Sequence, residues 1–130
     1  MTHEADCDTE FFPLPAGVHL PFSEAVRVGK MLYLSGQMGT DSTGKLVAGG
    51  VEAETRQILA NVRAVLERHG TSLDRVVRCL VMLADMQDWP AMNAVYLEHF
   101  RPPLPARSAF GASGLALGGR IELECIATIG

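Results

Sequence analysis

Arg107 and Glu122 are the residues of this sequence whose types and settings best suit chemistry on a small molecule. Arg107 follows the proline-rich stretch Pro102–Pro105 and opens a β-prone segment. Proline limits backbone freedom, which helps to hold a neighbouring side chain in place. The guanidinium fork of arginine matches both oxygens of a planar carboxylate. Arg107 therefore predicts a site that reads the carboxylate of a small metabolite.

Glu122 lies in the last β-prone segment of the chain, together with Glu124. Side chains alternate along a strand, so these two carboxylates share one face of it. A carboxylate that becomes buried needs an ion partner or a chemical role. Glu122 therefore either takes part in the same site as Arg107 or forms an ordinary ion pair with Arg107 or Arg120.

The sequence gives less support to a metal site, to histidine acid–base catalysis or to a serine nucleophile. The cysteines form no CxxC pair and no Cys/His cluster, so we expect no metal site. The histidines show no acid–base pairing, and a histidine near a helix end has a structural role there, because a cation meets the helix dipole favourably. The serines lack a visible His/Asp set. The residues concerned are Cys7, Cys79, Cys125, His3, His19, His69, His99, Ser35, Ser108 and Ser113.

Length and composition describe one ordinary globular domain. The chain has 130 residues, 48% of them hydrophobic and 20% charged, which suits a single domain with a real core. A net charge of -4 and a low aromatic content argue against a nucleic-acid partner. No apolar run is long enough to cross a membrane, and the acidic N-terminus has no signal core. We expect a cytoplasmic protein, and the odd number of cysteines fits a reducing compartment.

The elements that must position the candidate residues alternate between strands and helices. A loose lead-in covers residues 1–16. Gly29 and the following Lys suit the tight turn of a hairpin, Gly70 ends an amphipathic helix, and Asp88 with Pro90 begins a second helix. The predicted elements are strands over 25–28 and 31–35, a loop over 36–50, a helix over 51–69, a strand over 76–83, a helix over 88–100, and strands over 106–112 and 120–129.

The resulting order, ββαβαββ, predicts an α/β (α+β) domain in which two helices cover one face of a single sheet. The strands near residues 31–34 and 76–83 are apolar at nearly every position, which is typical of strands buried on both faces. In the last strand Ile121 and its odd-numbered neighbours face the helices, whereas Glu122 and Glu124 face the other side. Nothing else in the sequence covers that second face, so we expect oligomerisation through it.

Five segments together resemble the YjgF/RidA family of enamine/imine deaminases. They are SGQMG, ETRQILANVRAVLERHG, MNAVYLEHF, PARSAF and IELECIA. Their order and spacing agree with the family from about residue 16 to the C-terminus, about nine-tenths of the chain. The resemblance implies a YjgF-like, chorismate-mutase-like domain over residues 17–130, after the flexible lead-in over 1–16. It also implies a compact homotrimer with clefts between its subunits.

The activity that the resemblance implies is hydrolysis of reactive 2-enamino and 2-imino acids, such as 2-aminoacrylate, to 2-oxo acids and ammonia. The partner is therefore a small 2-imino or 2-oxo acid, and neither a metal nor an organic cofactor is implied. The family arginine that binds the substrate carboxylate corresponds to Arg107. The family glutamate that orients the attacking water corresponds to Glu122.

Further residues correspond to substrate-binding positions of the family. Ser35 and Gly36 match a loop near the ligand. Asn93 and Tyr96 match positions of the second helix that are associated with the cleft. Ala109 stands where the family often has cysteine and uses backbone groups.

Two departures from the family pattern bear on substrate choice and rate. Phe22 stands where active members often have tyrosine, so it keeps the ring without the hydroxyl, and the segment Gly111–Gly119 is richer in glycine than is usual. Both favour one alternative, a non-catalytic regulatory trimer that binds a small acid. A second alternative is an endoribonuclease or translation inhibitor, an activity reported for family relatives. The negative net charge and the unpaired histidines argue against it.

Overall fold

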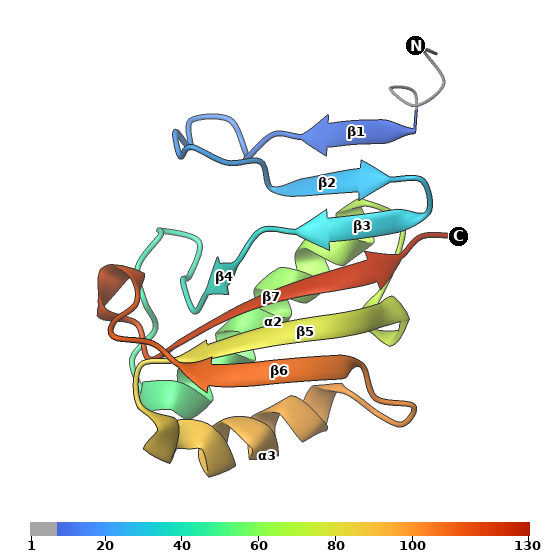
Figure 1. The fold of residues 1–130 in the computed structure, drawn as a ribbon. Helices are drawn as coiled ribbons and strands as arrows, with labels where there is room; N and C mark the ends of the chain where they lie inside the picture. The colour runs from blue at the N-terminus through green and yellow to red at the C-terminus, as the bar shows by residue number, and fades with distance from the viewer. Residues whose placement is uncertain (1–7) are drawn as a thin grey trace.

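The computed structural model describes residues 8–130, which form one mixed β-sheet with two helices (Figure 1). The strands lie in the order β1-β2-β3-β7-β5-β6, and β4 pairs with β7 beside this path. Neighbouring strands are antiparallel except β5 and β6, which are parallel. The strands are β1 (Thr9–Phe12), β2 (Ala25–Val28), β3 (Met31–Leu34), β4 (Gln37–Met38), β5 (Val76–Leu83), β6 (Ala106–Gly111) and β7 (Ile121–Thr128).

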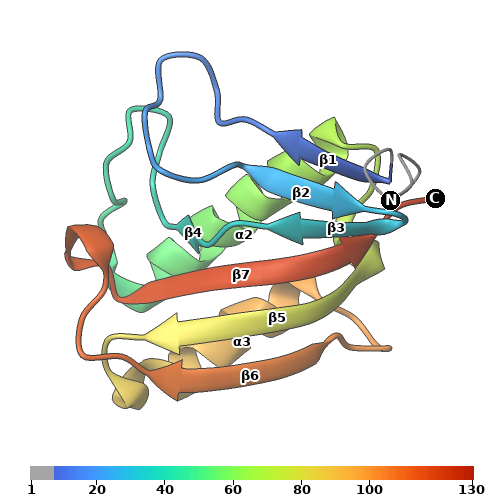
Figure 2. The same cartoon turned by 45° about the horizontal axis from the view of Figure 1, so that its top comes forward.

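Two α-helices, α2 (Gly50–Arg68) and α3 (Trp89–His99), pack against each other on one face of the sheet (Figure 2). Short 3-10 turns occupy Leu73–Arg75, Met86–Asp88 and Ala116–Gly118. The main elements confirm the predicted α+β domain and its ββαβαββ order. No helix of the described part of the chain is long and apolar enough to cross a membrane.

The helix α2 forms because its apolar residues recur with the helical period. Ile58, Leu59 and Val62 are each 0% exposed and form the centre of the core beneath the sheet. Burying an aliphatic side chain of this size contributes about 1.5–3 kcal/mol. Gly70 has a φ of 79°, a left-handed conformation that ends the helix as predicted.

The start of α3 differs in one detail from the sequence-based expectation. Pro90 lies in the first turn as predicted, but the Asp88 side chain makes no capping hydrogen bond. Its Oδ2 instead accepts bonds from Nε of Arg120 at 2.9 Å and from Nη2 at 2.8 Å. Two charge-assisted donors outcompete a single backbone amide for this carboxylate. Asp85 provides a cap one turn earlier, where it accepts a bond from the Gln87 amide at 2.9 Å.

The loose lead-in expected over residues 1–16 is corrected by the structure. Residues 9–12 form β1, an edge strand paired antiparallel with β2. Phe12 explains why this segment is fixed, since its ring stacks on His69 with 4.2 Å between the centroids. Local apolar burial and a ladder of backbone hydrogen bonds together order the strand. Cys7 and His3 lie outside the described residues.

The predicted loop over residues 36–50 also contains regular structure, because β4 pairs with β7. The Asn61 amide of α2 supports this stretch by donating to the carbonyls of Met38 at 3.2 Å and Thr40 at 3.0 Å. The loop therefore has its backbone groups satisfied from two directions. It places Gly36 beside the middle of the sheet.

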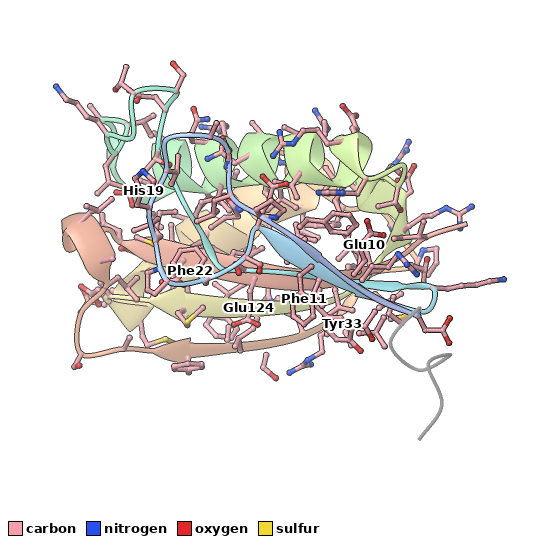
Figure 3. The ribbon with its side chains drawn as sticks, turned by 90° about the horizontal axis from the view of Figure 1, so that it is seen from above. Glu10, Phe11, His19, Phe22, Tyr33 and Glu124 are labelled. Carbon is pink, nitrogen blue, oxygen red and sulfur yellow. The ribbon has the colours of Figure 1, made fainter. Side chains whose placement is uncertain are left out.

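The sheet face opposite the helices has no covering element within residues 8–130 (Figure 3). Along β7, odd-numbered residues are buried and even-numbered residues are not, as predicted. Glu124, Tyr33 and Phe11 are labelled in Figure 3 on this uncovered side. Tyr33 is 42% exposed and Phe11 is 68% exposed. We call this surface the open face.

Candidate active site

Arg107 lies on β6 and points toward α3. Its strand neighbour in the ladder is Cys79, which is 0% exposed and faces the helices. The guanidinium carbon is 4.8 Å from the ring centre of Tyr96 and 5.4 Å from that of Trp89. Cation–π contacts of this kind hold the guanidinium without using its N–H groups. Among the described residues no carboxylate pairs with Arg107, and its one side-chain hydrogen bond is a long contact of 4.0 Å from Nη1 to the Met92 sulfur, so the guanidinium can bind an anionic ligand.

A pocket of about 240 Å³ opens beside this guanidinium. Its lining residues are Asn93, Tyr96, Leu97, Leu104, Pro105 and Arg107. Larger hollows occur elsewhere, for example about 370 Å³ beside the Pro102–Pro103 turn, but Arg107 does not line them. The structure thus brings three predicted site residues together in one half-site, which we call the arginine half.

Two buried polar atoms in the arginine half have no hydrogen-bond partner in the described chain, Asn93 Oδ1 and Tyr96 Oη. Buried polar atoms in native proteins almost always have partners. A bound acid with its own donors and acceptors would supply them. Burial raises the pKa of Tyr96 well above its usual range, and the nearby Cys79 thiol adds to this, so the hydroxyl stays protonated and can donate.

Ala109 lies on the same strand face as Arg107, two residues further along β6. Its ladder neighbour is Val81, which is 0% exposed, and Ala109 itself is half-buried. β6 is an edge strand of the sheet (Figure 2), so its outer backbone groups have no strand partner within the described residues and can pair with another molecule.

Glu122 lies on β7 and points to the open face. Its carboxylate rests against the backbone of Gly36, because a Cβ built on Gly36 would overlap Glu122 Oε2 and lie 3.1 Å from Cδ. Burial raises the pKa of the Glu122 carboxyl, and the charge of Glu124 raises it further. Neither of the ion pairs considered from the sequence forms, because Arg120 binds Asp88 and Arg107 is on the other side of the sheet.

Ser35 precedes Gly36 and is hydrogen-bonded to the segment that directly follows Phe22. The Ser35 hydroxyl donates to the carbonyl of Ser23 at 2.6 Å, and its amide donates to the carbonyl of Glu24 at 3.1 Å. The Phe22 ring is 48% exposed. Ser35 therefore holds the segment that carries Phe22, rather than projecting a free hydroxyl. These residues and Glu122 make a second half-site, which we call the glutamate half.

The two halves do not meet within one chain. Ladder neighbours share a sheet face, so Arg107, Cys79 and Cys125 lie in one row on the helix side. Glu122 lies in the row of Met82 on the open face. A site that uses both Arg107 and Glu122 must therefore combine the arginine half of one chain with the glutamate half of another.

Sequence reasoning missed one buried charge cluster near the glutamate half. Glu24 is 7% exposed and its carboxylate contacts Arg68 Nη2 at 2.5 Å and His69 Nε2 at 3.0 Å. His69 was expected only to complement the dipole at a helix end. No periodic signal marks Glu24, because it precedes β2 and its partners are 44 and 45 residues away.

The remaining predicted residues have structural surroundings. Cys79 and Cys125 are free and buried in strands, as predicted, and burial raises the pKa of Cys125 to about 12. His99 ends α3 and its ring contacts the Val95 carbonyl at 3.0 Å. Within residues 8–130 no cluster of His, Cys, Asp or Glu has the arrangement of a metal site.

The chain is similar to known proteins in both sequence and fold. A family model described as Endoribonuclease L-PSP matches residues 15–129. The 2-iminobutanoate/2-iminopropanoate deaminase of goat (Capra hircus) is 43% identical over 111 residues, which cover 85% of this chain and 81% of that protein. The crystal structure of yeast YEO7 matches with a TM-score of 0.83 and 35% identity, covering 92% of this chain and 93% of that one.

A second solved structure is RidA from an Antarctic Psychrobacter species. It matches with a TM-score of 0.81 and 37% identity, covering 91% of this chain and 94% of that one. The family model spans nearly the whole described chain, and the sequence and structure matches agree with it. The chain therefore belongs to the YjgF/RidA family, whose family model is named Endoribonuclease L-PSP.

Proposed function

We propose that this protein hydrolyses 2-enamino and 2-imino acids, such as 2-aminoacrylate, to 2-oxo acids and ammonia. The observation that carries the proposal is the Arg107 guanidinium, held on two aromatic rings beside a small pocket and without a carboxylate partner in the described chain. The goat relative, named a 2-iminobutanoate/2-iminopropanoate deaminase, supports the same reaction.

Arg107 binds the substrate carboxylate through its two-pronged donor set. The rings of Trp89 and Tyr96 fix the plane of the guanidinium. They thereby fix the position of the substrate carbon next to the bound carboxylate. Holding the reacting carbon in one place removes much of the entropy cost of attack. Asn93 and the Tyr96 hydroxyl complete the polar lining of the arginine half.

Glu122 orients the attacking water and takes its proton. The enamine tautomerises to an imine, whose protonated form has an electrophilic carbon. Water adds to that carbon as Glu122 takes its proton, and Glu122 then returns the proton to the amino nitrogen. The C–N bond breaks as the C=O bond forms, so that ammonia leaves with the 2-oxo acid as product. A carboxyl with a raised pKa is better matched to this proton transfer than an ordinary one. The reaction needs neither a metal nor an organic cofactor.

We propose that the active unit is a homotrimer with the site between subunits. The arginine half and the glutamate half lie on opposite faces of the sheet, so adjacent copies must supply one half each. The open face carries apolar residues such as Tyr33 and Phe11 that gain burial in such an assembly. The functional domain spans residues 17–130, and β1 adds an edge strand to its sheet. The free buried thiols fit a cytoplasmic location.

The reaction is tested by generating 2-aminoacrylate with a serine dehydratase and following pyruvate formation. Wild type should accelerate it, and Arg107→Ala should abolish the acceleration. Arg101→Ala is the matched control, because Arg101 is exposed and forms a long ion pair with Asp74 at 3.8 Å, away from the arginine half. Equal acceleration by wild type and Arg107→Ala would show that the mechanism is wrong. Calorimetric binding of 2-oxobutanoate without turnover would support a small-acid-binding regulatory trimer instead.

A further inference from the structure

We propose that Glu24 is a positioning residue for the glutamate half of the site. The inference rests on the proposed function, because it assigns a task to the wall formed by Phe22, Ser35 and Gly36. The Glu24 side chain makes no hydrogen bond or ion pair with a residue of either half-site. It acts by fixing the backbone that carries the glutamate half.

The Glu24 carboxylate is itself firmly held. Its side chain is 9% exposed, and its two oxygens bind Arg68 and His69 at the C-terminal end of α2. The His69 ring also packs against the Phe12 ring of β1. A carboxylate with two nitrogen partners and so little exposure has few alternative positions.

The backbone around Glu24 is hydrogen-bonded to the segment that forms the glutamate half. Its carbonyl accepts the Ser35 amide at 3.1 Å, and the neighbouring Ser23 carbonyl accepts the Ser35 hydroxyl at 2.6 Å. The next residue, Gly36, is the backbone surface on which the Glu122 carboxylate rests. Phe22 precedes Glu24 by two residues at the end of the β1–β2 connection. A continuous series of contacts therefore links the C-terminal end of α2 to Glu122, by way of Glu24, Ser35 and Gly36.

Three substitutions of the cluster test this assignment in the 2-aminoacrylate assay. Glu24→Gln keeps the shape and removes the charge, Glu24→Ala removes the anchor, and Arg68→Gln removes one partner. We expect kcat to fall about tenfold in Glu24→Ala, a loss typical of misplaced catalytic groups, and by less in Glu24→Gln. KM should stay within about twofold, because Arg107 still grips the carboxylate. Combining Glu24→Gln with Arg68→Gln should add little to the kcat loss.

Glu10→Gln is the matched control. It breaks the Glu10–Arg27 pair, which lies at 3.4 Å on the neighbouring strands β1 and β2 and touches neither half-site. A purely stabilising role predicts a lower melting temperature for the Glu24 variants with kcat unchanged, and that result would overturn the proposal. If Glu24→Ala does not fold, Glu24→Gln decides the question alone.

Amide hydrogen exchange separates this proposal from the proposed reaction. Glu24→Gln should speed exchange at the amides of Ser35 and residues 36–38, and leave β5 unchanged. This readout needs no turnover, so it holds even if wild type proves inactive and the reaction is wrong. Unchanged exchange at Ser35 would overturn the positioning role whatever the activity.

Discussion

Arg107 and Glu122 project from opposite faces of the same sheet, Arg107 toward α3 and Glu122 toward the open face. One chain therefore holds two halves of the candidate site that cannot touch each other. Assembly of identical subunits is the simplest way to bring such halves together, since a cyclic ring repeats the same heterologous contact at every interface.

The shared site predicts complementation between inactive variants. Arg107→Ala and Glu122→Gln should each lose nearly all activity alone. Subunits mixed at random in equal amounts should recover about a quarter of wild-type activity, because one interface in four then joins an intact arginine half to an intact glutamate half. The measurement is the dehydratase-coupled assay on the two variants refolded together.

The control for complementation is the same pair mixed as folded oligomers, without subunit exchange, which should stay inactive. The mass in solution should be about 42 kDa for three chains of 14.0 kDa. Refolded mixtures that remain inactive would mean that one chain supplies both groups. Such a result is incompatible with a site divided between subunits.

The acid side of the pH–rate profile should report the Glu122 carboxyl. As a base, Glu122 works only when ionised, so kcat/KM falls as the pH drops through its pKa. Burial and the charge of Glu124 raise that pKa, which places the fall at a higher pH than for an ordinary glutamate. Glu124→Gln removes the like charge, so the fall should move to lower pH.

Glu98→Gln serves as the matched variant for this pH experiment. Glu98 is exposed and pairs with Arg56 on the helical side at 3.2 Å. In Glu98→Gln, the fall of kcat/KM with falling pH should occur at the same pH as in wild type. The assignment of Glu122 as the base would be contradicted if this fall stayed at the wild-type pH in Glu124→Gln. It would also be contradicted if the fall moved equally in both variants.

Much of the fold was predictable because its signals are local. The period of apolar residues in α2, the proline at the start of α3 and the alternation along β7 each act over a few residues. The strands β1 and β4 were not, because their order comes from pairing with other strands, β1 with β2 and β4 with β7, rather than from a local pattern. β4 contributes only Gln37 and Met38, and its ladder partner lies on β7. No two-residue pattern marks a strand.

The candidate site was predictable in part for the same reason. The alternation along β7 placed Glu122 on the face away from the helices, and the structure confirms that side. The side taken by Arg107 depends on its register with Cys79, which no local pattern sets. Glu24 was not identified because both of its side-chain partners, Arg68 and His69, lie at the C-terminal end of α2, far from it in the sequence.

Tyr96→Phe should separate stability from ligand binding. The Tyr96 hydroxyl is buried without a hydrogen-bond partner among residues 8–130, and leaving such a group unpaired costs about 1–3 kcal/mol. Removing it should hold or raise the melting temperature of the unliganded protein. The same change should raise KM or weaken binding of 2-oxobutanoate, because the ligand loses a donor. A lower melting temperature without ligand would show that the hydroxyl already has a partner.

Gly36→Ala should damage catalysis while sparing the fold. A Cβ at this position would overlap Glu122 Oε2, so the carboxylate must swing away from its place on the backbone. A displacement of about 1 Å can cost a hundredfold in rate, and we expect kcat to fall between about tenfold and a hundredfold. Gly114→Ala is the matched control, because a Cβ on Gly114 meets nothing within 4 Å. Comparable kcat values for the two variants would mean that the contact between Gly36 and Glu122 has no part in positioning the catalytic water.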